Sequence, residues 1–334
     1  MITYIIRRVF GLLFTVWAAL TLVFFLYFIL PDDAANLLAG GGNRSIPESV
    51  VKNTAKKFGL DQPVWRQYFT YLGNVVTLDF GQSWKDGREV TDIIKERAPA
   101  SLRLAIWAIA LEASVGISLG ILSAKRKNSF ADTATTVAAA LASAIPVFVL
   151  GYALQQSTGV FAFEHQWPEW AQLPVQGIGP NQWYLAIIPS IEQFTYLVQP
   201  MVVLAAVSTV IVARLTRTTM LEMGKSDFVR TARAKGLTDG QVTRRHTLRN
   251  AMIPVITFLA IDFGTLVTAA ILTETVFNWP GLGSKIVSAS NGRDLPVLVG
   301  LTVVVVMVYG VVNLLADLSY AWFDPRVRLG EEGT

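Results

Sequence analysis

Long uncharged runs constrain this chain more than any other feature. The first run, Val9–Leu30, contains no charged side chain and is followed by Pro31. About 20 apolar residues in a helix, each rising roughly 1.5 Å, cross the hydrocarbon core of a bilayer. The whole chain is 52% hydrophobic and 16% charged, whereas a soluble domain carries about 25% charged residues. We therefore predict an integral membrane protein.

A secretory signal peptide would also begin with basic residues and an apolar run, as Arg7, Arg8 and Val9–Leu30 do here. The apolar part of a signal peptide spans roughly 7–15 residues and ends at a site of small residues. The run here is longer, and no such site follows closely. We favour a retained first transmembrane helix.

Five further apolar runs are expected to cross the membrane, which gives an all-α integral membrane protein with six transmembrane helices. They are Ser101–Ser123, Asp132–Gln155 with Pro146 inside, Tyr196–Arg214 with a possible extension to Met223, Ile253–Thr273 and Leu295–Leu318. This divides the chain into the N-terminal end with the first helix (1–31), a large extracytoplasmic region (32–100), a transmembrane domain (101–320) and a tail (321–334). Within 32–100 we expect an amphipathic helix at Ser45–Phe58 and an aromatic helix at Val64–Val76.

Basic residues set the orientation. They concentrate on the side of the two termini, at Arg7, Arg8, Lys125, Arg126, Lys127, Arg214, Arg217, Lys225, Arg230, Arg233, Lys235, Arg244, Arg245, Arg249, Arg326 and Arg328. Short loops rich in Lys and Arg stay in the cytoplasm, whereas long loops translocate largely regardless of charge. Both termini and the loop 224–252 are therefore predicted to be cytoplasmic, in a multi-pass protein of the bacterial inner membrane type.

The loop 224–252 has the signals of two short helices. Asp227 can cap a helix that begins at Phe228, and Gly236 suits its end. Phe228, Val229 and Ala232 are expected to share one face of it. Thr238 or Asp239 can cap the second helix. A solvated, positively charged loop is the simpler alternative, and nucleic-acid binding is disfavoured because no aromatic platform or recognised motif accompanies the charge.

Several catalytic classes find no support in the residues. Cysteine is absent and only His165 and His246 are present, which excludes a thiol nucleophile and makes a His-rich metal site unlikely. There is no H-E-x-x-H motif, and Gly224-Lys225-Ser226 lacks the first glycine of a nucleotide-binding P-loop, since residue 219 is Thr. We expect a chain without catalytic chemistry or a cofactor of its own; a secondary carrier or channel and a membrane-embedded enzyme are the classes considered as alternatives.

A family resemblance sharpens this expectation. Asp227–Leu237 (DFVRTARAKGL) followed by Arg249–Pro254 (RNAMIP) resembles the coupling loop of ATP-binding-cassette (ABC) importer permeases, most closely those of the dipeptide/oligopeptide family. Four other stretches agree in order, at Gly59–Pro63 (GLDQP), Gly81–Ser83 (GQS), Thr273–Gly283 (TETVFNWPGLG) and Tyr320–Gly330 (YAWFDPRVRLG). One departure is that Arg230-Thr231-Ala232 stands where the general importer pattern has Glu-Ala-Ala.

The resemblance implies the type I importer fold and a set of partners. These are a second homologous permease subunit, expected to be a different chain, two ATPase subunits that bind ATP and Mg, an extracytoplasmic substrate-binding protein and membrane lipid. It also implies import of dipeptides or oligopeptides, with nickel, glutathione and haem as alternatives within the family. The residues assigned to ATPase coupling are Asp227, Phe228, Val229, Arg230, Ala232, Arg233 and Gly236.

Two further groups of residues are candidates for function. Ionisable side chains inside a membrane commonly mark a substrate or ion path. On that basis the path candidates are Glu112, Asp262, Arg214, Arg217 and Asp317, with interhelical polar contacts as the alternative. The turn after the fifth span supplies candidates for an extracytoplasmic gate or a contact with the binding protein: Glu274, Phe277, Trp279 and Pro280.

Overall fold

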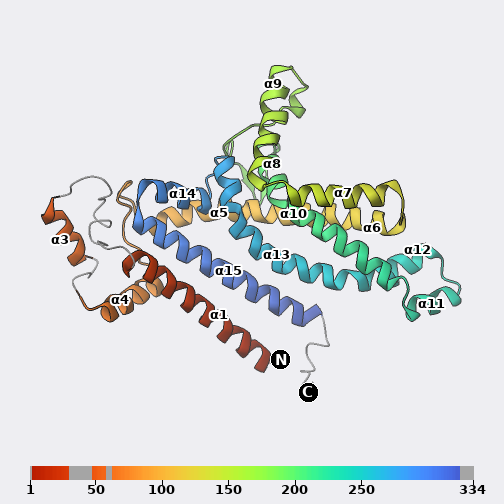
Figure 1. Cartoon of the computed structure of the whole chain (residues 1–334), viewed down its shortest axis with the longest axis horizontal. Coiled ribbons are helices and arrows are strands. Elements are labelled where there is room, and N and C mark those ends of the chain that lie inside the picture. The colour runs from red at the N-terminus through yellow and green to blue at the C-terminus, as the bar shows by residue number, and fades with distance from the viewer. Residues whose placement is uncertain (1, 30–46, 58–61, 324–334) are drawn as a thin grey trace.

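The computed structural model describes residues 2–29, 47–57 and 62–323, most of which are helical (Figure 1). The motif at 59–63 and the one at 320–330 lie partly outside the described residues. Five described segments are long and apolar enough to cross a membrane: Ile6–Ile29, Val90–Lys125, Ile191–Met223, Asp239–Val276 and Leu295–Leu315. They correspond to five of the six predicted spans.

The first span is α1 (Ile2–Phe24), which continues through a π-helical turn, η1 (Phe25–Ile29). The aromatic helix α4 (Val64–Thr77) forms as predicted and packs across the end of α1. Phe24 and Tyr68 meet edge to face with ring centroids 5.3 Å apart, and the hydroxyls of Thr21 and Tyr68 are 2.6 Å apart. The amphipathic helix is also present, as α3 (Glu48–Lys57).

The second span begins earlier than predicted. Helix α5 (Val90–Leu111) continues through the π-helical turn η2 (Glu112–Gly116) into α6 (Ile117–Lys125). Its first turns were assigned to the polar loop because they carry several charged side chains. Val90 and Ile93 are nevertheless buried against the start of α15 (Leu295–Phe323), so packing rather than hydropathy defines this end of the helix.

The centre of the bundle is formed by α5, α10 (Ile191–Met223) and α13 (Leu248–Val276). The span 196–214 does extend to Met223, as allowed for above. Glycines let η2 and α6 approach α10 closely: a Cβ on Gly116 would stand 2.8 Å from the Thr209 carbonyl, and one on Gly120 would stand 2.5 Å from Cβ of Thr216. Small residues commonly permit such contacts between membrane helices.

The predicted third span is two helices rather than one. Helix α7 (Phe130–Ala144) ends at Ile145, whose backbone is extended, and α8 (Val147–Leu154) begins after Pro146. Proline disfavours a helical conformation in the residue before it, which explains the break. From α8 the chain continues through η3 (Gln155–Phe161) and α9 (Ala162–Glu164), and this arm projects away from the other helices (Figure 1).

The remaining short elements lie at the ends of the bundle. Helices α11 (Asp227–Ala234) and α12 (Asp239–Val242), followed by η5 (Thr243–Thr247), occupy one end, and α14 (Leu282–Gly292) lies near the opposite end (Figure 1). A 3₁₀ turn, η4 (Glu169–Ala171), and a two-stranded antiparallel ribbon, β1 (Trp183–Tyr184) with β2 (Ile188–Pro189), precede α10.

Candidate functional site

The loop between α10 and α13 folds around a small apolar core of its own. Val229 and Ala232 of α11 are buried against Val242 of α12, with Leu237 packed beside them. Phe228 does not join this core, and 41% of its surface is exposed. The three residues were predicted to share one face of the helix, but only Val229 and Ala232 are buried, because α12 covers the side of α11 that carries those two residues. One aromatic side chain is thereby left exposed on a rigid support.

The turns of the loop differ from prediction in one detail. Ser226, not Asp227, is the N-cap of α11, and Asp227 is its first residue. At the other end Gly236 has φ +81°, as predicted for a glycine just past a helix end, and its amide donates to the Arg233 carbonyl. Thr238 begins α12, and its amide donates to the Gln241 side chain at 3.1 Å.

Charged side chains of the loop are exposed and pair locally. Arg230 lies 3.6 Å from Asp227 on the same helix, and Arg233 lies 3.2 Å from Asp239 across the turn. Exposed pairs of this kind contribute about 0–1 kcal/mol each to stability. The loop is therefore held by its apolar core and its turns, which leaves both arginines accessible to a partner.

The predicted gate residues are mostly buried inside this chain. The Glu274 carboxylate accepts hydrogen bonds from the Ser101 hydroxyl at 2.6 Å and from the Ser284 amide at 3.0 Å. The Ser101 hydroxyl in turn accepts from the Leu282 amide at 2.8 Å. Gly281 is required here, since a Cβ on it would lie 2.3 Å from the Glu274 carboxylate. Glu274, at the end of α13, thus connects the start of α14 to α5.

Aromatic residues complete this closed end. Trp279 is fully buried and donates from its indole nitrogen to the Ala100 carbonyl at 3.0 Å. Phe277 is also buried, and its carbonyl accepts from the Gly177 amide at 2.9 Å. Pro280 is half-buried. The turn therefore seals α13, α14 and α5 together instead of presenting its large side chains on the surface of the single chain.

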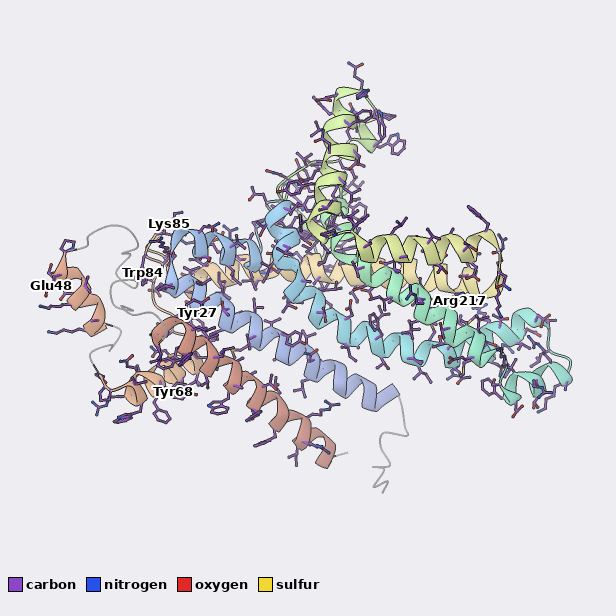
Figure 2. All side chains as sticks on the ribbon, in the orientation of Figure 1. Tyr27, Glu48, Tyr68, Trp84, Lys85 and Arg217 are labelled. Carbon is purple, nitrogen blue, oxygen red and sulfur yellow. The ribbon has the colours of Figure 1, made fainter. Side chains whose placement is uncertain are left out.

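A second carboxylate fixes the other end of α14. Asp294 accepts from the Ser83 hydroxyl at 2.5 Å and from the Trp84 amide at 3.2 Å, which explains the serine of the motif Gly81–Ser83. Lys285 reaches Asp86 at 2.7 Å, and this hydrogen bond holds the pKa of Asp86 below its ordinary value. The segment between α4 and α5, which contains Trp84 and Lys85, lies at the end of the bundle near α14 (Figure 2).

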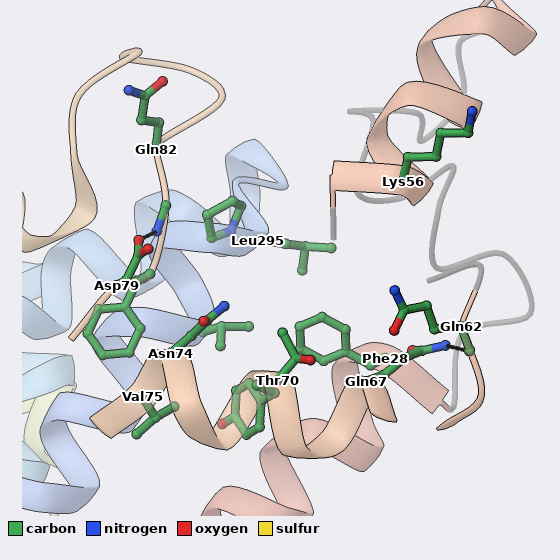
Figure 3. A pocket seen from close by; sticks show the side chains of 15 residues that line it. Phe28, Lys56, Gln62, Gln67, Thr70, Asn74, Val75, Asp79, Gln82 and Leu295 are labelled. Carbon is green, nitrogen blue, oxygen red and sulfur yellow. Dashed lines mark hydrogen bonds between the residues drawn. The ribbon is translucent and has the colours of Figure 1, made fainter. Parts of the chain in front are cut away.

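The same end contains a cavity of about 400 Å³ (Figure 3). Polar side chains from α4 and the segment after it line one part, among them Gln67, Asn74 and Asp79, while Phe28 and Leu295 contribute apolar surface. The Asp79 carboxylate accepts from the Gly81 amide at 3.2 Å, which shapes the segment that borders the cavity.

The path candidates divide into different environments. Glu112 is fully buried, Asp262 is 8% exposed, and the two carboxyl groups are close enough to interact electrostatically. Arg214 is exposed, and Asp317 lies in α15 where its side chain is outside the described residues. The structure thus brings Glu112 and Asp262 together, and leaves Arg214 apart from them.

Arg217 joins helices. Its guanidinium contacts both Asp132 carboxylate oxygens, at 2.5 and 2.9 Å, and Asp132 also accepts from the Ser123 hydroxyl at 2.5 Å. A bidentate arginine–carboxylate pair is among the stronger charge-assisted hydrogen bonds. This contact ties α10 to α7 and to the end of α6.

The partners of these residues did not stand out in the sequence. Ser101 and Asp132 begin predicted spans, where a polar residue is ordinary. Ser83 and Asp294 lie more than 200 residues apart in the sequence. Asp132 is the acidic residue of its predicted span, and that isolation was the available signal for a buried pair.

Comparison with known proteins agrees with this architecture. Residues 116–329 match the family described as "Binding-protein-dependent transport system inner membrane component", and residues 1–105 match its N-terminal component. The chain is 35% identical over 331 residues to the glutathione transport system permease protein GsiC of Escherichia coli K12, covering 98% of this chain and 99% of the relative. It is 33% identical over 326 residues to the probable peptide ABC transporter permease protein y4tP of Sinorhizobium fredii, covering 97% and 99%.

A solved structure shares the fold at low sequence identity. It is a chain of the MetNI methionine ABC transporter in inward-facing conformation, with a TM-score of 0.54 and 16% identity, covering 70% of this chain and 97% of that one. At this identity the likeness concerns the fold alone. With the family match over most of its length, the chain belongs to the binding-protein-dependent transport system inner membrane components, as an ABC importer permease of the dipeptide/oligopeptide type.

Proposed function

We propose that this permease subunit forms half of a path for short peptides and is driven by separate ATPase subunits that dock on the loop 224–252. The observation that carries the proposal is the exposed Phe228, presented with Arg230 on a helix whose other side is anchored by Val229 and Ala232. Hydrophobic anchors flanked by polar groups are typical of helices that enter a groove on a partner. ATP and Mg belong to the ATPase subunits in this proposal.

The proposed topology has six crossings, with α7 and α8 together making the third. Antiparallel α1 and α15 pack on each other, which places Ile2 and Phe323 toward the same side of the bundle (Figure 1). The basic residues of the loop 224–252 then place both termini in the cytoplasm, in a bacterial inner membrane. The region 32–100, α14 and the sealed turn around Trp279 face the outside.

The closed turn is the proposed outer gate. Glu274, Ser101 and Trp279 hold it shut, and opening requires that the Glu274 hydrogen bonds be exchanged. Contact with the substrate-binding protein is assigned to the neighbouring surface rather than to buried Phe277 or Trp279. The second permease subunit supplies the other half of the path. In this chain, the candidates for residues that face the path are Glu112, Asp262 and Arg214.

Short peptides are the proposed cargo. The relatives are named for glutathione and for peptide transport, and glutathione is itself a short peptide. Glutathione is therefore the first alternative cargo. Nickel and haem remain alternatives from the wider family.

Co-purification and uptake test this function. Tagged chain extracted from its native membranes is expected to bring down an ATPase and a second permease chain. Deletion of the chain is expected to abolish uptake of a labelled dipeptide, with unlabelled glutathione added in a parallel assay to detect competition. ATP-independent transport by the purified chain alone would instead identify a secondary carrier.

A further inference from the structure

Two acidic side chains meet in the interior of the bundle without a basic partner. Glu112 lies on η2 and is fully buried, and Asp262 lies on α13 and is 8% exposed. Both carboxyl oxygens of Glu112 and Oδ2 of Asp262 have no hydrogen-bond partner among the described residues. Each carboxyl is close enough to act electrostatically on the other. A lone buried carboxylate costs several kcal/mol, and a second like charge adds to that cost.

Charged groups on the surrounding elements do not neutralise the pair. On α5, Arg103 lies nine residues before Glu112, roughly 14 Å along the helix, and donates to the Ala186 carbonyl. On α10, Arg214 is exposed and Arg217 is bound to Asp132.

The other charged groups stand farther along the helices that pack on the pair. Lys125 ends α6, 13 residues after Glu112, and Glu274 lies 12 residues after Asp262 and is bound to Ser101. Glu192 stands at the start of α10 and Arg249 at the start of α13. On α15, the Asp317 side chain is outside the described residues. Among the described residues, no basic side chain therefore neutralises the pair.

We propose that Glu112 and Asp262 together form a proton-binding site, in which one carboxyl stays protonated and donates to the other carboxylate. A proton is favoured over a larger cation because Glu112 is fully buried and a proton shared between the two carboxyls needs no further ligand. The site goes beyond the peptide import proposed above and does not depend on which cargo is carried. Its consequence is that the contact between Glu112 and Asp262 weakens when the pair loses its proton.

Infrared spectroscopy of the purified, intact transport complex tests for the proton directly. Wild type at pH 7 is expected to show the carbonyl stretch of a protonated carboxylic acid, and Glu112→Gln combined with Asp262→Asn is expected to lose it. Glu192→Gln, an exposed acid on α10, is the matched control and is expected to keep it. An identical band in wild type and in the double variant, or no band in wild type, would overturn the proposal.

Two additional measurements keep the test decisive. If the double variant does not fold, the infrared band of the wild-type complex is titrated instead. The thermal unfolding midpoint of the wild-type complex is also expected to fall as pH rises from 6 to 9. Between the unfolded and the folded carboxyl pKa, one proton held only by the folded state lowers the folding equilibrium constant about tenfold per pH unit. A band that is absent in sodium buffer and present in choline buffer would assign the site to Na⁺ and contradict the proton. Loss of peptide uptake with an unchanged band would concern the transport function only.

Discussion

Arg217 illustrates how one side chain gains its role from a residue distant in sequence. It was a candidate for the translocation path, yet its guanidinium forms an ion pair with Asp132, which is 5% exposed. Removing one partner of a buried pair strands the other charge, and this generally costs about 3–5 kcal/mol. Asp132 keeps its bonds from Ser123 and from the Asn128 amide, so part of this cost is avoided.

We expect Arg217→Ala to destabilise the chain by roughly 2–3 kcal/mol, because Asp132 is left without its cation. Arg214→Ala, on the same helix but exposed, is the matched control and should stay within about 0.5 kcal/mol of wild type. Thermal unfolding in detergent measures both. Equal stability of the two variants would show that the ion pair contributes nothing.

Gly281 shows the same dependence on a distant contact. A Cβ there would collide with the Glu274 carboxylate, so Gly281→Ala is expected to cost about 1–3 kcal/mol through overpacking and to loosen the closed turn. Gly73→Ala in α4, where nothing lies within 4 Å of the added Cβ, should be neutral or stabilising. Protease sensitivity near residue 281, compared between the variants, gives the readout; equal sensitivity would contradict the role of the glycine.

At the scale of elements, the loop 224–252 owes its form to two turns and a small core. Gly236 has φ +81° with open space around its Cβ position, whereas Gly240 is helical and equally open. An alanine at each position therefore separates backbone strain from steric clash. A left-handed conformation costs a non-glycine residue about 1–2 kcal/mol.

Gly236→Ala is expected to destabilise the loop by about 1–2 kcal/mol, and Gly240→Ala is expected to stabilise it slightly. Amide hydrogen exchange over residues 226–247 measures the local effect and should be roughly 5–30 times faster in Gly236→Ala. Equal exchange in both variants would mean that α11 does not end through a left-handed glycine.

The elements also show where sequence reasoning stops. Five spans and α4 were predictable because hydropathy and turn residues act locally. The start of α5 at Val90 was missed because its burial depends on α15. The break at Pro146 was missed because the apolar run 132–155 was predicted as one span with the proline inside it. Ser226 displaced Asp227 as the cap, a difference of one residue that capping propensity alone does not resolve.

For the site, the sequence indicated the loop 224–252 and the turn after the fifth span, but not which of their side chains are buried and which are exposed. Phe228 and Val229 are adjacent, and only the position of α12 decides that Val229 is buried and Phe228 exposed. Likewise, Glu112 and Asp262 were separate candidates, and their proximity follows from how α13 packs along the helix that continues from α5 into η2.

At the scale of the whole molecule, the proposed topology makes a direct prediction. Because the natural chain has no cysteine, single cysteines report accessibility without background. Lys127→Cys and Arg244→Cys are expected to be protected from a membrane-impermeant maleimide in intact cells, and Glu164→Cys and Asn291→Cys are expected to react. All four residues are exposed in the structure. The reverse labelling pattern would invert the topology.

The most direct measurement concerns coupling through α11. In a complex reconstituted with the proposed ATPase subunits and binding protein, Phe228→Ala removes the exposed aromatic side chain and leaves the buried core of the loop intact. Loss of such an anchor typically costs 2 kcal/mol or more, so ligand-stimulated ATP hydrolysis is expected to fall roughly tenfold or more. Glu222→Ala, exposed on α10 just before the loop, should retain wild-type stimulation. Wild-type stimulation in Phe228→Ala would contradict docking of the ATPase on this face of α11.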